Sequence, residues 1–127
     1  MDAEGVFPAI SRISGTAVRR FFETGYTSVM PGTESGVTEI QRTFSPCYGS
    51  PFMPRSVQTY SDMLIDKVEQ HGSNVFLVNT GMNPESGERF ALDFTRNTIK
   101  QAILTEYPMR DTSETVLQTL EQIIEGA

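Results

Sequence analysis

Hydrophobic residues recur along this chain with two different spacings. In segments 14–23, 56–71 and 93–104 they return every three to four residues, which is typical of helices with one buried face. Segments 26–30 and 74–79 are instead short and rich in β-branched and aromatic residues, as strands are. The pattern predicts a small mixed α/β fold.

The last segment, 113–125, has the clearest helical pattern of the chain. Gly126 follows it as a stop signal. Its apolar stripe either covers the rest of the domain or docks on a partner or a second copy. One face of such a helix would carry Val116, Leu117, Leu120, Ile123 and Ile124.

Three further segments predict irregular structure. Residues 2–13 contain Gly5 and Pro8 and are expected to form a loop, and residues 31–36 form a turn-rich break. Residues 43–54 are also irregular, with aromatic and apolar side chains expected to pack inward. There is no internal repeat or obvious linker, so residues 1–127 are expected to form a single domain.

Segment 74–95 is the most informative part of the chain. A buried strand is predicted to end at Asn79-Thr80-Gly81, and a polar loop then leads to a short extended segment from Arg89 and a helix. In open α/β sheets, ligands bind beyond the carboxyl ends of strands. The segment is therefore either a ligand-facing loop or a simple strand-to-helix connection.

Composition limits the classes of partner. The 127 residues carry a net charge of −6 and a sequence pI near 4.7, which disfavours binding to nucleic acid or an anionic membrane. No stretch approaches the roughly 20 apolar residues of a transmembrane helix, and the first residues are acidic where a signal peptide is basic. A soluble cytoplasmic protein is expected.

Individual reactive side chains give little sign of catalysis. Cys47 is the only cysteine, so no internal disulfide forms, and nothing in the sequence places the only histidine, His71, beside it. His71 precedes Gly72, where helices commonly end. Asp62 and Asp66 share a helix face, but their polar neighbours indicate surface charges. No catalytic residue and no metal ligand is assigned.

Five segments follow one another along the chain, among them TFSPCYGSPF, VFLVNTG and GERFALDFTRNTIKQAIL. In the same order they resemble the C-terminal part of ATP-dependent phosphoenolpyruvate carboxykinases. The resemblance implies the fold of the C-terminal part of that family's nucleotide-binding domain. Residues 107–127 have no clear counterpart and are expected to form a divergent helical tail. The matching segments are residues 2–14, 21–39, 43–52, 75–81 and 87–104.

The resemblance also implies a role for three residues. By its position in the motif, Arg89 matches the family's arginine that packs against the adenine and ribose of ATP. Phe90 matches the apolar residue that follows this arginine, and Thr95 matches the threonine beside the adenine base. A planar guanidinium stacks well on an aromatic base, and a threonine hydroxyl can read the base edge. Alternatively, Arg89 is solvated or paired with a carboxylate, and Thr95 caps a helix.

The family reaction converts oxaloacetate and ATP to phosphoenolpyruvate, ADP and carbon dioxide, with divalent metals. No G-x-x-x-x-G-K-[ST] pattern occurs here, so the family's P-loop has no counterpart. The resemblance places the family's metal ligands and substrate arginine in the larger part of the family sequence, which this chain does not match. The complete reaction is therefore not expected from this chain alone. The expected partners are a P-loop-bearing chain, which would also supply the metal site, or a second copy. A non-catalytic binding protein derived from the family is the alternative.

Two departures from the family pattern predict weak nucleotide affinity. Residues 82–88, MNPESGE, replace a tryptophan and a glycine-rich basic stretch, and they place Glu85 and Glu88 near the expected polyphosphate. Like charges in a partly buried site repel with little screening. Ser35 stands where the family usually carries arginine.

Overall fold

The computed structural model describes residues 1–29, 31–32, 35–36, 38–104 and 110–127. Within them the chain forms four α-helices and two small antiparallel sheets, which confirms the predicted mixed α/β fold. Residue 30 at the expected strand end, residues 33–34 of the expected turn and residues 107–109 of the expected tail lie outside the described residues.

Helix α1 (Gly15–Thr24) forms where the sequence predicts it. Ala17, Val18 and Phe21 lie on one face and are buried. The helix ends at Gly25, whose left-handed φ of 60° allows its N–H to donate to Phe21 C=O at 2.8 Å. A Cβ at Gly25 would lie 1.7 Å from the carbonyl oxygen of Ser45, so only glycine fits this stop.

Helix α4 (Ser113–Glu125) has the predicted bounds, and its apolar stripe turns inward. Val116, Leu120 and Ile123 are buried, and Leu117 and Ile124 pack against the same core. The core also includes Phe7, Phe21 and Tyr26, whose rings lie 5.8 Å apart in the pairs Phe7–Phe21 and Phe7–Tyr26. Most of the stripe is therefore covered within the chain.

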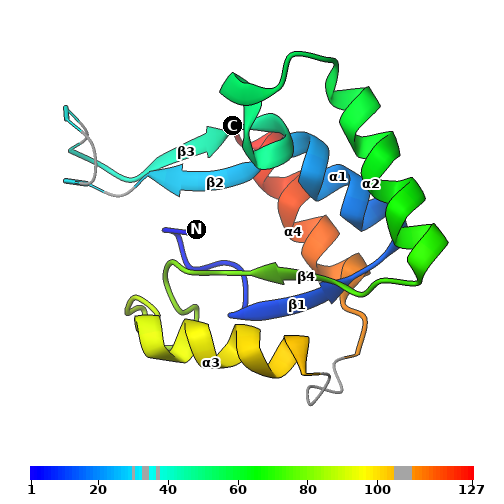
Figure 1. The fold of residues 1–127 in the computed structure, drawn as a ribbon. Coiled ribbons are helices and arrows are strands. Elements are labelled where there is room, and N and C mark those ends of the chain that lie inside the picture. Colours follow the sequence, from blue (N-terminus) through cyan, green and yellow to red (C-terminus); the bar gives the residue numbers. More distant parts are fainter. Residues whose placement is uncertain (30, 33–34, 37, 105–109) are drawn as a thin grey trace.

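The strands form two separate antiparallel pairs. β1 (Ile10–Ile13) pairs with β4 (Val75–Val78), and β2 (Tyr26–Val29) pairs with β3 (Gln41–Phe44). Figure 1 shows that the β2–β3 hairpin projects from the body of the molecule. The rule that places ligands at the carboxyl ends of parallel strands therefore does not apply to the strands described here.

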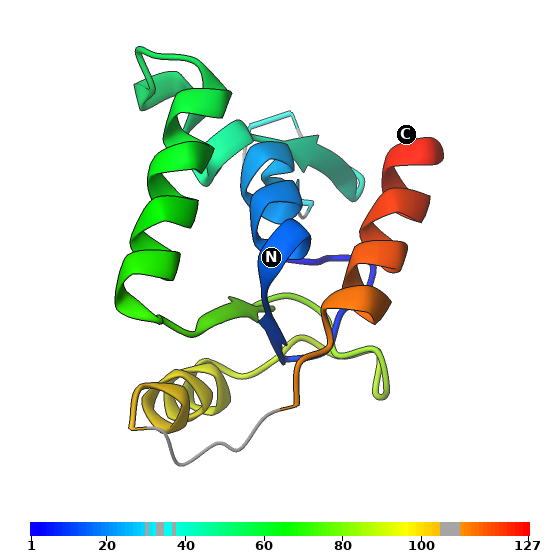
Figure 2. The same cartoon turned by 90° about the vertical axis from the view of Figure 1, so that its right-hand side faces the viewer.

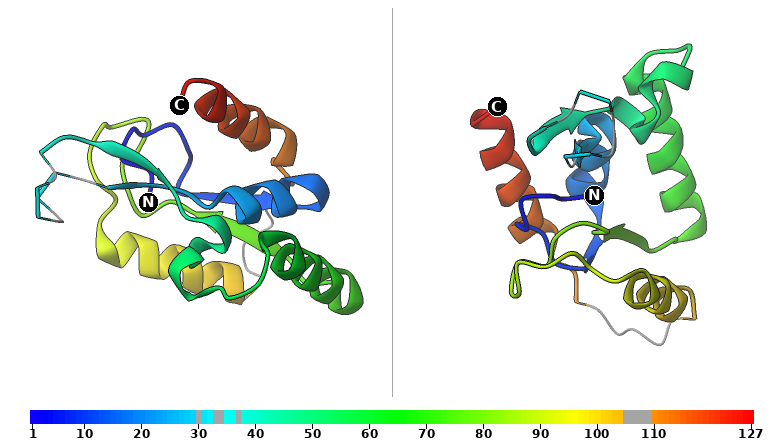
Figure 3. Two further views of the ribbon diagram at one scale, coloured as in Figure 1. Left: turned by 90° about the horizontal axis from the view of Figure 1, so that it is seen from above. Right: turned by 90° about the vertical axis from the view of Figure 1, so that its left-hand side faces the viewer.

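The β1–β4 pair lies between two helical layers. α2 (Val57–His71), α1 and α4 lie on one side of it, with α1 in the middle (Figure 2), and α1 contacts both neighbours. α3 (Leu92–Ile103) lies on the opposite side of the strands (Figure 3). Among the described residues, no helix is long and apolar enough to cross a membrane. The cytoplasmic location stays a prediction.

Three local predictions were wrong. Residues 2–13 were expected to form a loop, but Ile10–Ile13 forms β1, because pairing with β4 more than 60 residues away organises a segment too short to show a clear pattern. The inward packing expected of residues 43–54 holds for Cys47 but not for Phe44, Tyr48 and Phe52, which are exposed.

The third wrong prediction is the irregular structure expected from residue 43, because Thr43 and Phe44 are the last two residues of β3. The boundaries of the other helices and strands lie within one residue of the predictions. The short turns η1 (Pro46–Tyr48) and η2 (Ser50–Phe52) interrupt the irregular segment. The expected extended segment at 89–92 is reduced to an isolated bridge between Met82 and Arg89, and α3 begins at Leu92.

Candidate functional site

The loop after β4 is held by the N-terminal segment of the chain. The side chain of Asn79 is buried, and its Oδ1 accepts hydrogen bonds from the backbone N–H groups of Asp2 (3.1 Å) and Gly81 (2.8 Å). Its Nδ2 donates to the carbonyls of Phe7 (2.9 Å) and Met82 (3.1 Å). Asn79 therefore uses both ends of its amide to join two backbone segments.

Asp2 holds the N-terminal segment in place against the loop after β4. Its buried carboxylate accepts hydrogen bonds from the backbone N–H groups of Glu4 (3.1 Å), Val6 (2.7 Å) and Phe7 (2.8 Å). The hydroxyl of Tyr26 also donates to it at 3.4 Å. The carboxylate thus organises a turn that delivers Phe7 to the core.

The close approach of the two segments explains the glycine after Asn79. Met82 N–H donates to Asp2 C=O at 2.8 Å, and a Cβ on Gly81 would lie 2.1 Å from that carbonyl oxygen. Because the amide of Asn79 is saturated by backbone groups, this part of the loop holds the fold together instead of facing a ligand.

The three residues assigned by resemblance lie close in sequence but in different environments. Arg89 is exposed, and its side chain makes no hydrogen bond or ion pair with a described residue. Phe90 is half-buried, and its N–H donates to Gly81 C=O at 2.8 Å. Thr95 is buried inside the first turn of α3, so it does not cap the helix, which begins after Ala91.

A small cavity of about 200 Å³ opens beside Phe90. Phe90 stacks on Phe94, with ring centroids 5.5 Å apart and an angle of 10° between the ring planes. Phe94 was not singled out from the sequence, because Phe90 lies before α3 and helical spacing does not link the two rings. The cavity is lined by Pro8, Ala9, Asn83, Pro84, Glu85, Phe90 and Phe94.

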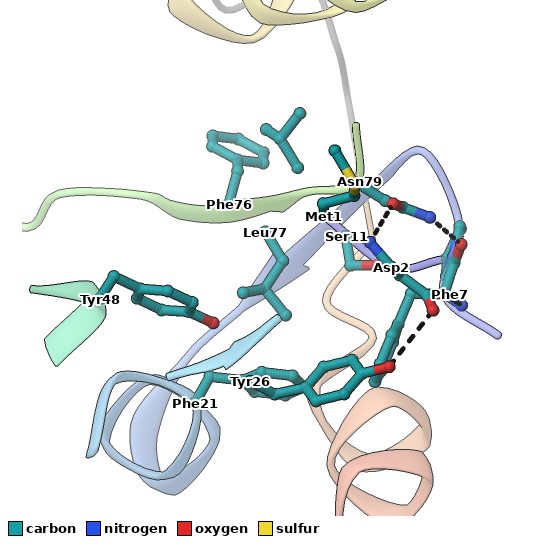
Figure 4. A pocket seen from close by; sticks show the side chains of 12 residues that line it. Met1, Asp2, Phe7, Ser11, Phe21, Tyr26, Tyr48, Phe76, Leu77 and Asn79 are labelled. Atoms are coloured by element: carbon teal, nitrogen blue, oxygen red, sulfur yellow. Dashed lines mark hydrogen bonds between the residues drawn. The ribbon is translucent and has the colours of Figure 1, made fainter. Parts of the chain in front are cut away.

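A larger cavity of about 320 Å³ lies between β4 and the core aromatic residues (Figure 4). Its polar groups include Asp2, Asn79 and the Tyr26 hydroxyl, and they are mostly occupied by the contacts described above. Burial raises the pKa of Tyr26 to about 12, although a hydrogen bond with Ser28 opposes the shift, so the phenol stays neutral near pH 7. The cavity is thus lined by apolar side chains together with polar groups that have partners within the chain.

The candidate nucleophile and the histidine have structural positions. Cys47 is buried with a φ of 58°, and burial raises the pKa of its thiol, with a further contribution from the Glu23 carboxylate. A raised pKa disfavours the reactive thiolate. His71 lies in the last turn of α2, and Gly72 ends that helix.

The described residues contain no group of three or more His, Cys, Asp or Glu side chains arranged to hold a metal ion. Asp62 is half-exposed, as expected of a surface charge, but it also pairs with Arg19 at 2.8 Å and so ties α2 to α1. The described part of the chain therefore assigns no residue to a divalent metal.

Comparison with known proteins identifies the family. A family model described as phosphoenolpyruvate carboxykinase matches residues 1–121. The phosphoenolpyruvate carboxykinase (ATP) of Bacillus subtilis (strain 168) is 47% identical over 105 residues, covering 80% of this chain and 20% of that protein. The protein of the same name from Bacillus mycoides (strain KBAB4) is 44% identical over 116 residues, covering 89% of this chain and 22% of that protein.

The chain therefore belongs to the phosphoenolpyruvate carboxykinase family, which confirms the resemblance found from the sequence motifs. It spans about a fifth of the length of these curated relatives. The family match extends to residue 121 and so includes most of α4, for which the motifs alone showed no counterpart.

Proposed function

We propose that this chain forms the adenine side of an ATP site of the phosphoenolpyruvate carboxykinase type. The observation that carries the proposal is the exposed Arg89, which has no described ion-pair partner and directly precedes Phe90 at the small cavity. The name phosphoenolpyruvate carboxykinase (ATP) of the relatives supports the choice of nucleotide.

The chemistry of these side chains suits a purine ring. An unpaired guanidinium attracts an aromatic face and keeps donors for the ribose. The stacked pair Phe90–Phe94 gives the cavity an aromatic wall, and Pro8 and Pro84 add apolar surface. Thr95 directly follows Phe94 in α3, and its contact with the base stays a prediction.

The size of the cavity indicates an incomplete site. Small-molecule sites usually enclose about 300–1,000 Å³, whereas the cavity beside Phe90 encloses about 200 Å³. Its walls therefore fit a ring but not a whole nucleotide. The phosphates need a P-loop, and the sequence contains none.

We further propose that the complete reaction requires the P-loop-bearing part of a phosphoenolpyruvate carboxykinase. ATP then supplies the phosphoryl group, while oxaloacetate loses carbon dioxide and becomes phosphoenolpyruvate. In that assembly Arg89 and Phe90 position the base. Residues outside this chain would hold the divalent metal and the phosphates.

The direct test is a two-dimensional amide NMR titration of the purified chain with Mg-ATP. We expect shifts around residues 81–95, and Arg89→Ala should weaken binding about tenfold, or about 1.4 kcal/mol. Arg96→Ala is the matched control, because Arg96 is also an exposed arginine near this site. Equal losses in both variants would show non-specific charge attraction and contradict the proposal.

A second candidate function is favoured by one observation. Glu85 lines the same cavity as Phe90, and a carboxylate there repels the phosphates of a nucleotide. A family member with this feature would serve as a non-catalytic binding protein. Mg-ATP would then shift no amide, while the spectrum of the chain remains dispersed.

A further inference from the structure

Strand β4 has one edge without a neighbouring strand among the described residues. On its paired side, Asn79 N–H donates to Ala9 C=O at 2.9 Å. Bonded and non-bonded residues alternate in an antiparallel ladder, so Leu77 directs its backbone groups toward β1. Phe76 and Val78 therefore direct their N–H and C=O groups to the open side.

The other edge of the sheet supports this assignment. Arg12, which stands opposite Phe76, uses its C=O to accept a hydrogen bond from Thr112 N–H at 3.0 Å on the outer side of β1. The outer edge of β1 is thus partly covered by the segment before α4. The outer edge of β4 has no equivalent cover in the described part of the chain.

The sequence of β4 is also typical of a strand that has a neighbouring strand on each side. Val75-Phe76-Leu77-Val78 is an unbroken apolar run, which is typical of strands buried on both faces. All four residues are only half-buried here. An unpaired apolar strand edge is a ready site for strand addition.

The larger cavity lies along this edge. Phe76 and Leu77 both line it, although they point to opposite faces of the strand (Figure 4). Side chains from both faces of β4 therefore border the cavity. Tyr48 lies at the cavity with half of its surface exposed, so an apolar side chain entering there would cover it.

We propose that the open edge of β4 receives an extended strand from the P-loop-bearing remainder of a phosphoenolpyruvate carboxykinase chain. The strand pairs with the outward backbone groups of Phe76 and Val78 and places an apolar side chain in the larger cavity. The inference rests on the proposed function for the identity of the partner. It also rests on length, since the matched region is only 20% to 22% of the relatives.

A second copy of this chain is the competing occupant. Each copy carries a net charge of −6, so two copies repel each other at low ionic strength. The remainder of the family chain is therefore the better partner.

The first experiment compares backbone hydrogen exchange in the isolated chain and in a complex. The chain is co-expressed with the Bacillus subtilis relative lacking its matched 105 residues, and the complex is purified. The N–H groups of Phe76 and Val78 should exchange quickly in the isolated chain and at least about 100-fold more slowly in the complex. Leu77 N–H should be protected in both.

Three outcomes would overturn the proposal. One is a complex in which Phe76 and Val78 exchange as fast as in the isolated chain. Another is protection of both groups in the isolated chain at concentrations where it dimerises, which would assign the edge to a second copy. The third is failure to recover any complex from the co-expression.

Substitutions at the edge separate docking from folding. Val78→Pro removes the outward N–H, and it should weaken the complex at least about tenfold. The matched control is Val78→Thr, which keeps the N–H and the shape and should bind within about threefold of the parent chain. Tyr48→Asp places a charge at the cavity from an exposed position, so it tests the same surface without altering the strand.

Docking at β4 and ATP binding at Arg89 can be tested separately. Arg89→Ala should leave complex formation unchanged, because Arg89 does not line the larger cavity. A complex formed through β4 that shows no Mg-ATP binding would refute the proposed nucleotide role and support the docking surface. If Mg-ATP shifts the amide signals of a chain that forms no complex, the result would support the nucleotide role and refute the docking surface.

Discussion

The α1–α4 side of the molecule and the β4–α3 side use their apolar residues in opposite ways. On the first side, Leu120 is fully buried and Val116, Ala17 and Val18 expose 3% of their surface or less. On the second, Ile103 exposes 75% of its surface. The same chain therefore contains a well-buried core on one side and exposed apolar residues on the other.

This difference separates what stabilises the chain from what it offers to other molecules. The core around α1 and α4 closes on itself, because their apolar faces meet and their charged residues pair, as Arg20 does with Glu121. The β4–α3 side holds the open strand edge and the exposed Arg89. Leu92 and Ile99 of α3 are exposed as well, and exposed apolar residues of this kind are found at interaction surfaces.

Removing residues 113–127, which include α4, should have the largest effect on the stability of the chain. The deletion takes away three buried residues of α4 and exposes Phe21 and Tyr26, so we expect the chain to unfold or aggregate. Circular dichroism and size-exclusion chromatography measure the outcome. An unchanged melting curve would show that α4 adds little to the core.

A single cavity-forming substitution sharpens the comparison between the two sides. Leu120→Ala should lower the free energy of unfolding by about 2–5 kcal/mol, since the side chain is fully buried. The control Ile103→Ala, on the exposed side, should change it by about 0.5 kcal/mol or less. Urea unfolding measures both, and similar losses would erase the distinction between the two sides.

The hydrogen bonds of the Asn79 side chain should contribute slightly less to the free energy of unfolding than Leu120 does. Asn79→Ala leaves two N–H and two C=O groups without their partner, and we expect a loss of about 2–4 kcal/mol in the free energy of unfolding. Asn83→Ala is the matched control, because its amide oxygen accepts one hydrogen bond from a described residue, the exposed Glu85 N–H, and the substitution should cost about 0.5 kcal/mol. Equal losses would contradict the structural role of Asn79.

The smallest predicted effect is the pH dependence at the start of α4. Hydrogen bonds from Ser113 and Ser14 lower the pKa of Asp111 from 3.8 to about 2. Because the folded-state pKa is the lower one, the contribution to stability is complete above about pH 4 and disappears as the pH falls to about 2.

Asp111→Ala tests this contribution directly. The variant should be less stable than the parent chain at pH 5, and the two should converge as the pH approaches 2. Thermal unfolding across this range is the measurement. A constant difference at all pH values would mean that the Asp111 charge does not stabilise the contact between the ends of α1 and α4.

Much of the fold was predictable from local pattern. The spacing of apolar residues gave α4 its bounds, and Gly25 and Gly72 marked the ends of α1 and α2. The candidate residues Arg89, Phe90 and Thr95 came from family motifs, and their role in nucleotide binding stays a prediction. β1 was missed because its four residues become a strand only through β4.

The sequence by itself determined the helices, their stop signals and the family, because these depend on residues that are neighbours along the chain. Only the tertiary structure decided that Asn79 is saturated by backbone groups, that Arg89 is exposed and that β4 keeps an open edge. These properties depend on pairing between segments some 60 to 80 residues apart, such as Arg12 with Phe76 or Asp2 with Asn79. Local spacing carries no record of such partners.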